Sequence, residues 1–198
     1  MNEKELKIIK EKALENHIPI IMDDTLEYIY KLYNDRKIGS ILEIGTAVGY
    51  SAICFTKLLN NEGFIDTIER NEERIEKAKV NITKAEVQDR INIISGDAVD
   101  ILPSINKKYD MVFIDAAKGK YPFFLKEALR MLNENGTILA DNILYKGYVM
   151  SDYNKHKQRT AVRHLREYIK ETTENPELDT KILKIGDGLA ITKKASKV

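Results

Sequence analysis

The chain has 198 residues, of which 43% are hydrophobic and 32% charged, a composition typical of one folded domain over residues 1–198 and not of a disordered chain. Its 32 Lys and Arg balance 31 Asp and Glu, so the net charge of +1 excludes nucleic-acid binding driven by overall charge. No segment resembles a signal peptide or reaches the roughly 18 apolar residues of a membrane span. The one cysteine, Cys54, follows a helical pattern and is expected to be a buried hydrophobe, so we expect a cytoplasmic protein without membrane contact.

Apolar residues recur at helical spacing over residues 3–16 and 24–35, which predicts two helices within an N-terminal segment, residues 1–37. Over residues 38–194, short β-rich runs alternate with helical patterns, which predicts a Rossmann-like α/β core with a mostly parallel sheet. The predicted parallel strands are residues 40–44, 64–69, 91–94, 111–115 and 137–141. The predicted helices of this core are residues 50–59, 72–85, 98–102, 122–132 and 160–171.

The last part of the chain has a different pattern. The segment "TKILKIGDGLAITKK" holds two strand-like runs joined at Asp187-Gly188, a dipeptide that favours a tight hairpin turn. An antiparallel pair is therefore expected after the five parallel strands, unlike the sheet of all-parallel dinucleotide dehydrogenases.

The first strand-to-helix turn reads "ILEIGTAVGYS" and carries Glu43, Gly45 and Gly49. Glycines there let the backbone approach a ligand, but the spacing differs from the G-x-G-x-x-G of dinucleotide sites. An acid at this turn repels a pyrophosphate and suits a ligand with positive charge. The next strand ends at Glu69, a natural acceptor for ribose hydroxyls. The strand after it ends at Asp97-Ala98, where we expect these residues to border the adenine ring. These strand ends predict S-adenosylmethionine (SAM) as cofactor; the alternative is a tight turn with solvated acids.

Two further strands each deliver an acid where an apolar run ends. "MVFIDAAKGKY" gives Asp115, with Lys118 three residues later, and "GTILADN" gives Asp141 followed by Asn142. Because neighbouring parallel strands end at the same sheet edge, Asp115, Asp141 and Asn142 should converge. Two carboxylates and an amide oxygen suit Mg²⁺ or another hard divalent cation. The alternative is that each Asp caps the turn or helix that follows it.

The segments "EIGTAVGYS", "IER", "GDA", "DAAKGKY" and "ADN" resemble the metal-dependent O-methyltransferases, the family of catechol and caffeoyl-CoA O-methyltransferases, over roughly residues 18–194. The resemblance implies a seven-stranded Rossmann-like methyltransferase fold with a reversed final hairpin, and commonly a homodimer. It assigns metal binding to Asp115, Asp141 and Asn142, and catalysis to Lys118 beside Asp115. The predicted donor site comprises Glu43, Gly45, Gly49, Ser51, Glu69, Asp97, Ala98 and Asp115.

The resemblance also implies a mechanism and a substrate. Two vicinal substrate oxygens bind the metal, Lys118 accepts the proton, and the oxyanion attacks the methyl group of SAM. The compact chain is most similar to bacterial members that methylate 5-hydroxyuridine in the tRNA anticodon loop to 5-methoxyuridine. That base offers a hydroxyl beside the C4 carbonyl oxygen, a vicinal pair that a metal can chelate as it does a catechol.

Residues 144–166 carry six Lys or Arg against one acid, interleaved with three tyrosines. Basic and aromatic residues together suit a single-stranded anticodon loop, although charge runs are commonly solvated surface. The predicted RNA surface comprises Lys120, Lys146, Lys155, Lys157, Arg159, Arg163 and Arg166, with Tyr145, Tyr148 and Tyr153. Two alternatives remain open: an O-methyltransferase of a catechol-like small molecule, and a non-catalytic nucleotide- or RNA-binding module.

Overall fold

The computed structural model describes residues 2–152 and 158–195, and the chain divides into two compact units, residues 1–104 and 105–198. Its strands and helices form a Rossmann-like α/β fold, with seven strands that are mostly parallel and antiparallel pairing at the C-terminal end. The predicted fold class is thus confirmed. The prediction of a single domain stays a prediction, because each unit is compact by itself. Within the described ranges, none of the helices is long and apolar enough to cross a membrane.

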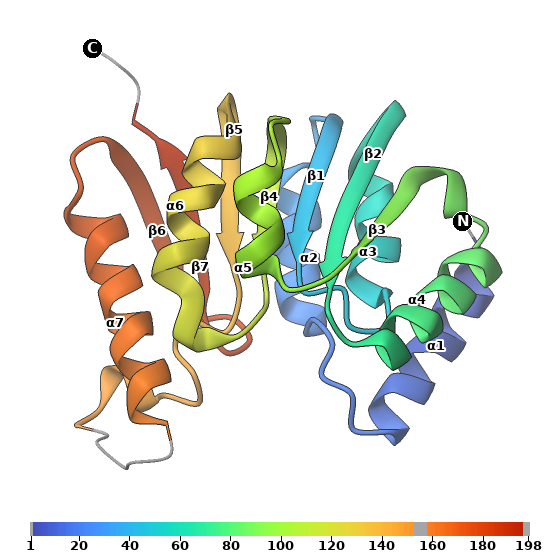
Figure 1. Cartoon of the computed structure of the whole chain (residues 1–198), viewed down its shortest axis with the longest axis horizontal. Coiled ribbons are helices and arrows are strands. Elements are labelled where there is room, and N and C mark those ends of the chain that lie inside the picture. The colour runs from blue at the N-terminus through green and yellow to red at the C-terminus, as the bar shows by residue number, and fades with distance from the viewer. Residues whose placement is uncertain (1, 153–157, 196–198) are drawn as a thin grey trace. The chain divides into compact units, whose positions relative to one another are not determined.

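The first unit is a three-stranded parallel sheet with helices around it (Figure 1). Its strands lie in the order β3-β2-β1, with bounds Ile38–Ile44 (β1), Leu59–Glu69 (β2) and Ile91–Ser95 (β3). Its α-helices are α1 (Glu3–Glu15), α2 (Asp23–Leu32), α3 (Tyr50–Phe55), α4 (Glu72–Lys84) and α5 (Ala98–Ile101). Its 3₁₀ turns are η1 (Thr56–Leu58), η2 (Gln88–Arg90) and η3 (Leu102–Ser104).

A side-chain cap fixes the start of α4, one of the longer helices of this unit. Asn71 begins α4 by accepting a hydrogen bond from the Arg74 amide at 2.9 Å, which satisfies one of the free donors of a helix start.

On α3, Cys54 is fully buried, and this burial raises the pKa of its thiol to about 11. The expectation of a buried cysteine is confirmed.

The second unit is a four-stranded sheet with α6 and α7 side by side on one face (Figure 1). Its strands lie in the order β4-β5-β7-β6, with bounds Tyr109–Ile114 (β4), Leu132–Ala140 (β5), Leu178–Leu183 (β6) and Leu189–Lys194 (β7). Strands β4 and β5 are parallel, whereas β7 pairs antiparallel with both β5 and β6. Its helices are η4 (Lys118–Lys120), α6 (Tyr121–Met131), η5 (Tyr148–Met150) and α7 (Arg159–Glu174).

Two predicted strand starts are wrong, for the same reason. Strand β2 begins at Leu59 and β5 at Leu132, both earlier than predicted, and the helices before them end earlier. The segments "LNNEG" and "LNENG" begin these strands, and the pairing register shifts between Ile38 and Ser40 of β1 and between Tyr109 and Met111 of β4. Because the residues at each register shift are mostly polar, the apolar pattern that marks a strand begins only after the polar segment.

The predicted hairpin turn at Asp187-Gly188 is bound to the segment that follows β5. The amide of Ile143 donates to the Gly188 carbonyl, and that of Leu144 to the Asp187 carbonyl, both at 3.0 Å. The Asp187 side chain also accepts from the Lys146 amide at 2.6 Å. This turn therefore holds the backbone directly after Asn142.

Two glycines of this unit offer a matched test of that contact. Both have a positive φ, 92° at Gly188 and 77° at Gly147. A Cβ at Gly188 would lie 2.9 Å from the Leu144 backbone nitrogen and overlap its side chain, whereas a Cβ at Gly147 meets nothing within 4 Å. Backbone strain alone should lower the free energy of unfolding by about 1 kcal/mol in Gly147→Ala, whereas strain plus overlap should cost about 3 kcal/mol in Gly188→Ala. Urea denaturation measures both, and equal losses would contradict the packing argument.

Candidate functional site

The glycine turn between β1 and α3 has three residues at positive φ. They are Gly45 at 111°, Ala47 at 47° and Gly49 at 82°. A Cβ at Gly49 would lie 3.3 Å from the Ala78 Cβ of α4, so glycine lets this turn pack against the helix. The turn is also fixed from the other side, because the Asn81 side chain donates to the Val48 carbonyl at 2.9 Å.

Glu69, at the end of β2, anchors this turn through backbone amides. Its Oε2 accepts from the Ala47 amide, and its Oε1 accepts from the Arg70 and Asn71 amides, all at 3.0 Å. These contacts hold Ala47, a non-glycine residue, in the left-handed region. Oε2 accepts one of these three bonds and keeps a second lone pair, so the predicted ribose contact stays a prediction.

Glu43 lies inside the protein and not on its surface. Its carboxylate is fully buried and accepts hydrogen bonds from the hydroxyls of Ser51 and Thr67. Thr67 in turn contacts the Thr46 hydroxyl at 2.6 Å, so the acid is satisfied by a hydroxyl network beneath the glycine turn. The structure brings Glu43 and Ser51 together, and their predicted contact with SAM stays a prediction.

Asp97 begins α5 by accepting from the Val99 amide at 2.9 Å, with Ala98 as the first helical residue. Its other oxygen pairs with Arg70 at 3.0 Å. Because Glu69 pairs in register with Ser95, Asp97 and Glu69 come from adjacent strand ends. Two acids beside a tight turn with close backbone suit a nucleoside that carries positive charge, as SAM does.

In the second unit, Asp115 and Asp141 follow residues that are paired across two parallel strands. Ile114 of β4 is in register with Ala140 of β5, and the Asp141 amide donates to the Ile114 carbonyl at 2.9 Å. The predicted convergence at this edge is therefore present in the structure. Asn142 comes next with a φ of 56°, a left-handed conformation that turns the chain sharply after the strand.

The Lys118 ammonium lies between these oxygens. Its Nζ donates to Asp115 Oδ1 at 2.9 Å and to Asn142 Oδ1 at 3.0 Å. The Asp115 and Asn142 oxygens thus attract a cation to this position, and a metal ion bound by the same oxygens would lie close to it.

Asp141 is the acid of this group whose ionised form is destabilised by its surroundings. It is 1% exposed, and burial first, then the negative charge of Asp115, raise the pKa of its carboxyl from 3.8 to about 7. Its Oδ1 accepts a hydrogen bond from the amide of its neighbour Asn142 at 2.7 Å. Within the described ranges, no three His, Cys, Asp or Glu side chains cluster as metal ligands, since this set has two acids and an amide. A hard divalent cation fits this oxygen set.

Two residues of this unit were missed as parts of the site. Tyr121 is fully buried, accepts from Lys118 Nζ at 2.9 Å and donates to the Asp141 carbonyl at 2.7 Å. His164 of α7 contacts the Gly119 carbonyl through Nδ1 at 2.6 Å and so ties the turn that carries Lys118 to α7. A signal for Tyr121 existed in its spacing of three residues from Lys118. His164 was expected only as part of the basic patch over residues 144–166, and its contact with Gly119 was not predicted.

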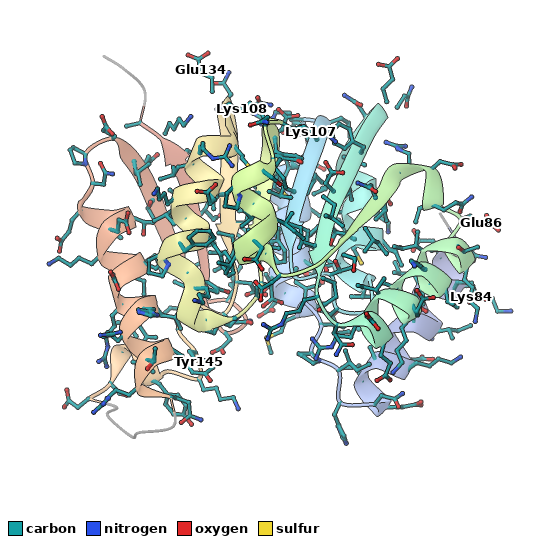
Figure 2. All side chains as sticks on the ribbon, in the orientation of Figure 1. Lys84, Glu86, Lys107, Lys108, Glu134 and Tyr145 are labelled. Atoms are coloured by element: carbon teal, nitrogen blue, oxygen red, sulfur yellow. The ribbon has the colours of Figure 1, made fainter. Side chains whose placement is uncertain are left out.

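The predicted RNA surface is described only in part. Lys120, Lys146, Arg159 and Arg163 are exposed, whereas Lys155, Lys157 and Tyr153 lie outside the described residues. Arg166 has a structural role, because its guanidinium donates to the Val149 carbonyl at 3.0 Å and to two neighbouring carbonyls. Figure 2 shows Tyr145 at the end of the second unit toward which β4 and β5 run, and Lys107, Lys108 and Glu134 at the other end. The ring centroids of Tyr145 and Tyr148 lie 5.8 Å apart, and the two rings meet edge to face.

A profile of the O-methyltransferase family matches residues 3–195. The chain belongs to the O-methyltransferase family. A catechol O-methyltransferase of Niastella koreensis is 32% identical over 161 residues, which cover 77% of this chain and 72% of that protein. The resemblance to the family of catechol and caffeoyl-CoA O-methyltransferases is confirmed.

Solved structures agree with this assignment. A Staphylococcus aureus protein, provisionally described as a caffeoyl-CoA O-methyltransferase, is 34% identical with a TM-score of 0.88, covering 96% of this chain and 92% of its own. TomG of Streptomyces achromogenes, an O-methyltransferase solved with SAM, shares the fold with a TM-score of 0.87 at 24% identity, over 99% of this chain and 92% of its own. The prediction of a SAM-dependent O-methyltransferase is confirmed at the level of the family.

Replacing Glu69 should loosen the glycine turn. Glu69→Ala removes the acceptor of three backbone amides, so we expect the free energy of unfolding to fall by about 2–3 kcal/mol. Glu62→Ala, an exposed acid on the same strand, serves as the matched control and should change it by less than about 0.5 kcal/mol. Guanidinium denaturation checks both variants, and a Glu69→Ala protein as stable as the control would show that the turn holds itself.

Proposed function

We propose that this O-methyltransferase binds a hard divalent cation, Mg²⁺ in the simplest case, through Asp115, Asp141 and Asn142. The observation that carries the proposal is the cation-seeking group of oxygens around Lys118. Asp141 is buried with a raised pKa beside a second acid, and the ammonium of Lys118 bridges Asp115 and Asn142. Two like charges at paired strand ends are costly in a protein that only binds nucleotides, and they suit one that uses a metal.

The divalent ion supplies, when bound, the positive charge that favours the ionised form of a substrate hydroxyl. The chain's own residues do the rest. Asp115, Asp141 and Asn142 would hold the ion that orients the acceptor oxygens, and Lys118, as the neutral amine, would receive the hydroxyl proton on its Nζ. Glu69 and the glycine turn hold the donor, whose methyl group passes to the acceptor oxygen. Alignment and charge stabilisation should supply most of the rate.

We propose 5-hydroxyuridine of the tRNA anticodon loop as the substrate, with 5-methoxyuridine as the product. Its hydroxyl and C4 carbonyl oxygen form the vicinal pair that this chemistry requires. The exposed cations Lys120, Lys146, Arg159 and Arg163 lie in the same unit as the proposed metal ligands and support a phosphate-bearing substrate. Tyr145 and Tyr148 offer rings on which unpaired bases can stack.

A second candidate is methylation of a catechol-like small molecule. The names of relatives favour it, since catechol O-methyltransferases of Niastella koreensis and of Mycobacterium tuberculosis are each 32% identical to this chain. A panel of catechols and tRNA from a methylation-deficient strain, in which 5-hydroxyuridine lacks its methyl group, distinguishes the two acceptors when each is offered with labelled SAM and Mg²⁺.

Asp141→Asn should separate stability from activity. The substitution keeps the size and one acceptor but removes a buried charge that Asp115 repels, so in chelator the variant should be about 1 kcal/mol more stable than wild type. Methyl transfer should fall at least about 100-fold, because a metal ligand is lost. Thermal denaturation and transfer of labelled methyl groups measure the two effects.

Chelation and one control complete that experiment. EDTA should abolish transfer by wild type, and added Mg²⁺ should restore it. Asp179→Asn, an exposed acid on β6, should leave both stability and transfer unchanged. Full activity of the wild type in chelator would reject the metal, whatever the acceptor.

A tRNA substrate predicts a phosphate contribution from α7. Arg159 and Arg163 are exposed and lie one helical turn apart, so they point in the same direction. Replacing both by Gln should lower kcat/KM for tRNA about 10-fold and make the salt dependence of KM shallower. Lys170→Gln, near the other end of α7, is the matched control and should leave both values unchanged. A double variant that methylates tRNA as wild type does would count against this surface.

A further inference from the structure

Lys118 is fully saturated in this structure, and its partners are unusual for a proton acceptor. An ammonium carries three N–H donors. Those of Lys118 are taken by Asp115 Oδ1 at 2.9 Å, the Tyr121 hydroxyl at 2.9 Å and Asn142 Oδ1 at 3.0 Å. The side chain is only 15% exposed, so water has little access to it. Two of the three oxygens belong to the proposed metal ligands.

A metal ion and this ammonium compete for those oxygens. Mg²⁺ requires its ligand oxygens at about 2.1 Å, in a nearly octahedral arrangement. An ammonium within 3.0 Å of Asp115 and Asn142 would then face a dication at close range, and the two positive charges would repel each other. Binding of the divalent ion should therefore displace the ammonium from Asp115 and Asn142.

We propose that Lys118 is a built-in placeholder cation. Its ammonium neutralises the Asp115–Asp141 pair in the metal-free protein, and Lys118 leaves Asp115 and Asn142 when a divalent ion binds. This inference rests on the proposed metal site and adds an exchange of cations to it.

Tyr121 is the positioning residue that receives the displaced side chain. Its hydroxyl donates to the Asp141 carbonyl at 2.7 Å, so its lone pairs are directed to other partners, and one already accepts from Lys118. The ring is fully buried, and Lys118 Nζ lies 5.1 Å from its centroid, within range of a cation–π contact. Lys118 can therefore give up two partners and keep the third without leaving the turn that carries it.

Calorimetric titration of the full chain with Mg²⁺ tests the exchange without any catalytic assay. Lys118→Met removes the competing charge, so the variant should bind Mg²⁺ about 10-fold more tightly than wild type. Lys118→Gln, which keeps a polar group, should also bind more tightly and guards against a folding defect in the Met variant. Lys120→Met is the matched control, because it makes the same charge change two residues away at an exposed position, and it should bind as wild type does within about twofold.

A double-mutant cycle tests Tyr121. Tyr121→Phe should weaken Mg²⁺ binding about threefold where Lys118 is present, because the Tyr121 hydroxyl is one of three partners before the exchange and the remaining one after it, so its loss costs the displaced ammonium more. In the Lys118→Met background the same change should have no effect. An equal effect in both backgrounds would overturn the positioning role of Tyr121.

The outcomes separate this inference from the proposed function. Equal or weaker Mg²⁺ binding by both Lys118 variants would overturn the placeholder while leaving the metal site in place. Absence of Mg²⁺ binding in wild type and variants alike would overturn the metal site and the placeholder together.

Discussion

Electrostatic repulsion between two carboxylates governs the second unit. Parallel pairing of Ile114 with Ala140 delivers Asp115 and Asp141 to one sheet edge, where burial raises the pKa of Asp141. Neither acid can move away, because each directly follows a buried strand. The Lys118 ammonium, the left-handed turn at Asn142 and the Tyr121 hydroxyl are best understood as the surroundings that make this pair tolerable. Stability is given up there, as is common where a site must attract a charged ligand.

Much of the architecture could be predicted because it follows from local chemistry. Apolar runs predicted the parallel strands. The Asp187-Gly188 dipeptide predicted the hairpin of β6 and β7, in which β7 also pairs antiparallel with β5. The starts of β2 and β5 could not be found, since the strands begin in polar segments whose pairing depends on a neighbouring strand. Register irregularities are tertiary facts, and an apolar pattern within one segment carries no trace of them.

The candidate site divides along the same line. The acids at strand ends were predictable, because topology alone brings Asp115 to Asp141. What the sequence did not contain was the internal use of polar groups: Glu43 satisfied by hydroxyls, Arg166 by carbonyls. Tyr121 reads as a core aromatic, and only its hydroxyl partners reveal another role. Such partners come from elements distant in sequence, which residue type and spacing do not encode.

The hairpin turn that binds the backbone after Asn142 has a consequence for the order in which the enzyme becomes competent. Gly188 and Asp187 accept hydrogen bonds from Ile143 and Leu144, some forty residues earlier in the chain. During synthesis, Asp115, Asp141 and Asn142 all emerge from the ribosome well before their support does. The nascent chain therefore carries its pair of acids without the turn that holds the backbone after Asn142, and this edge of the sheet is completed only after residues 187 and 188 have been synthesised.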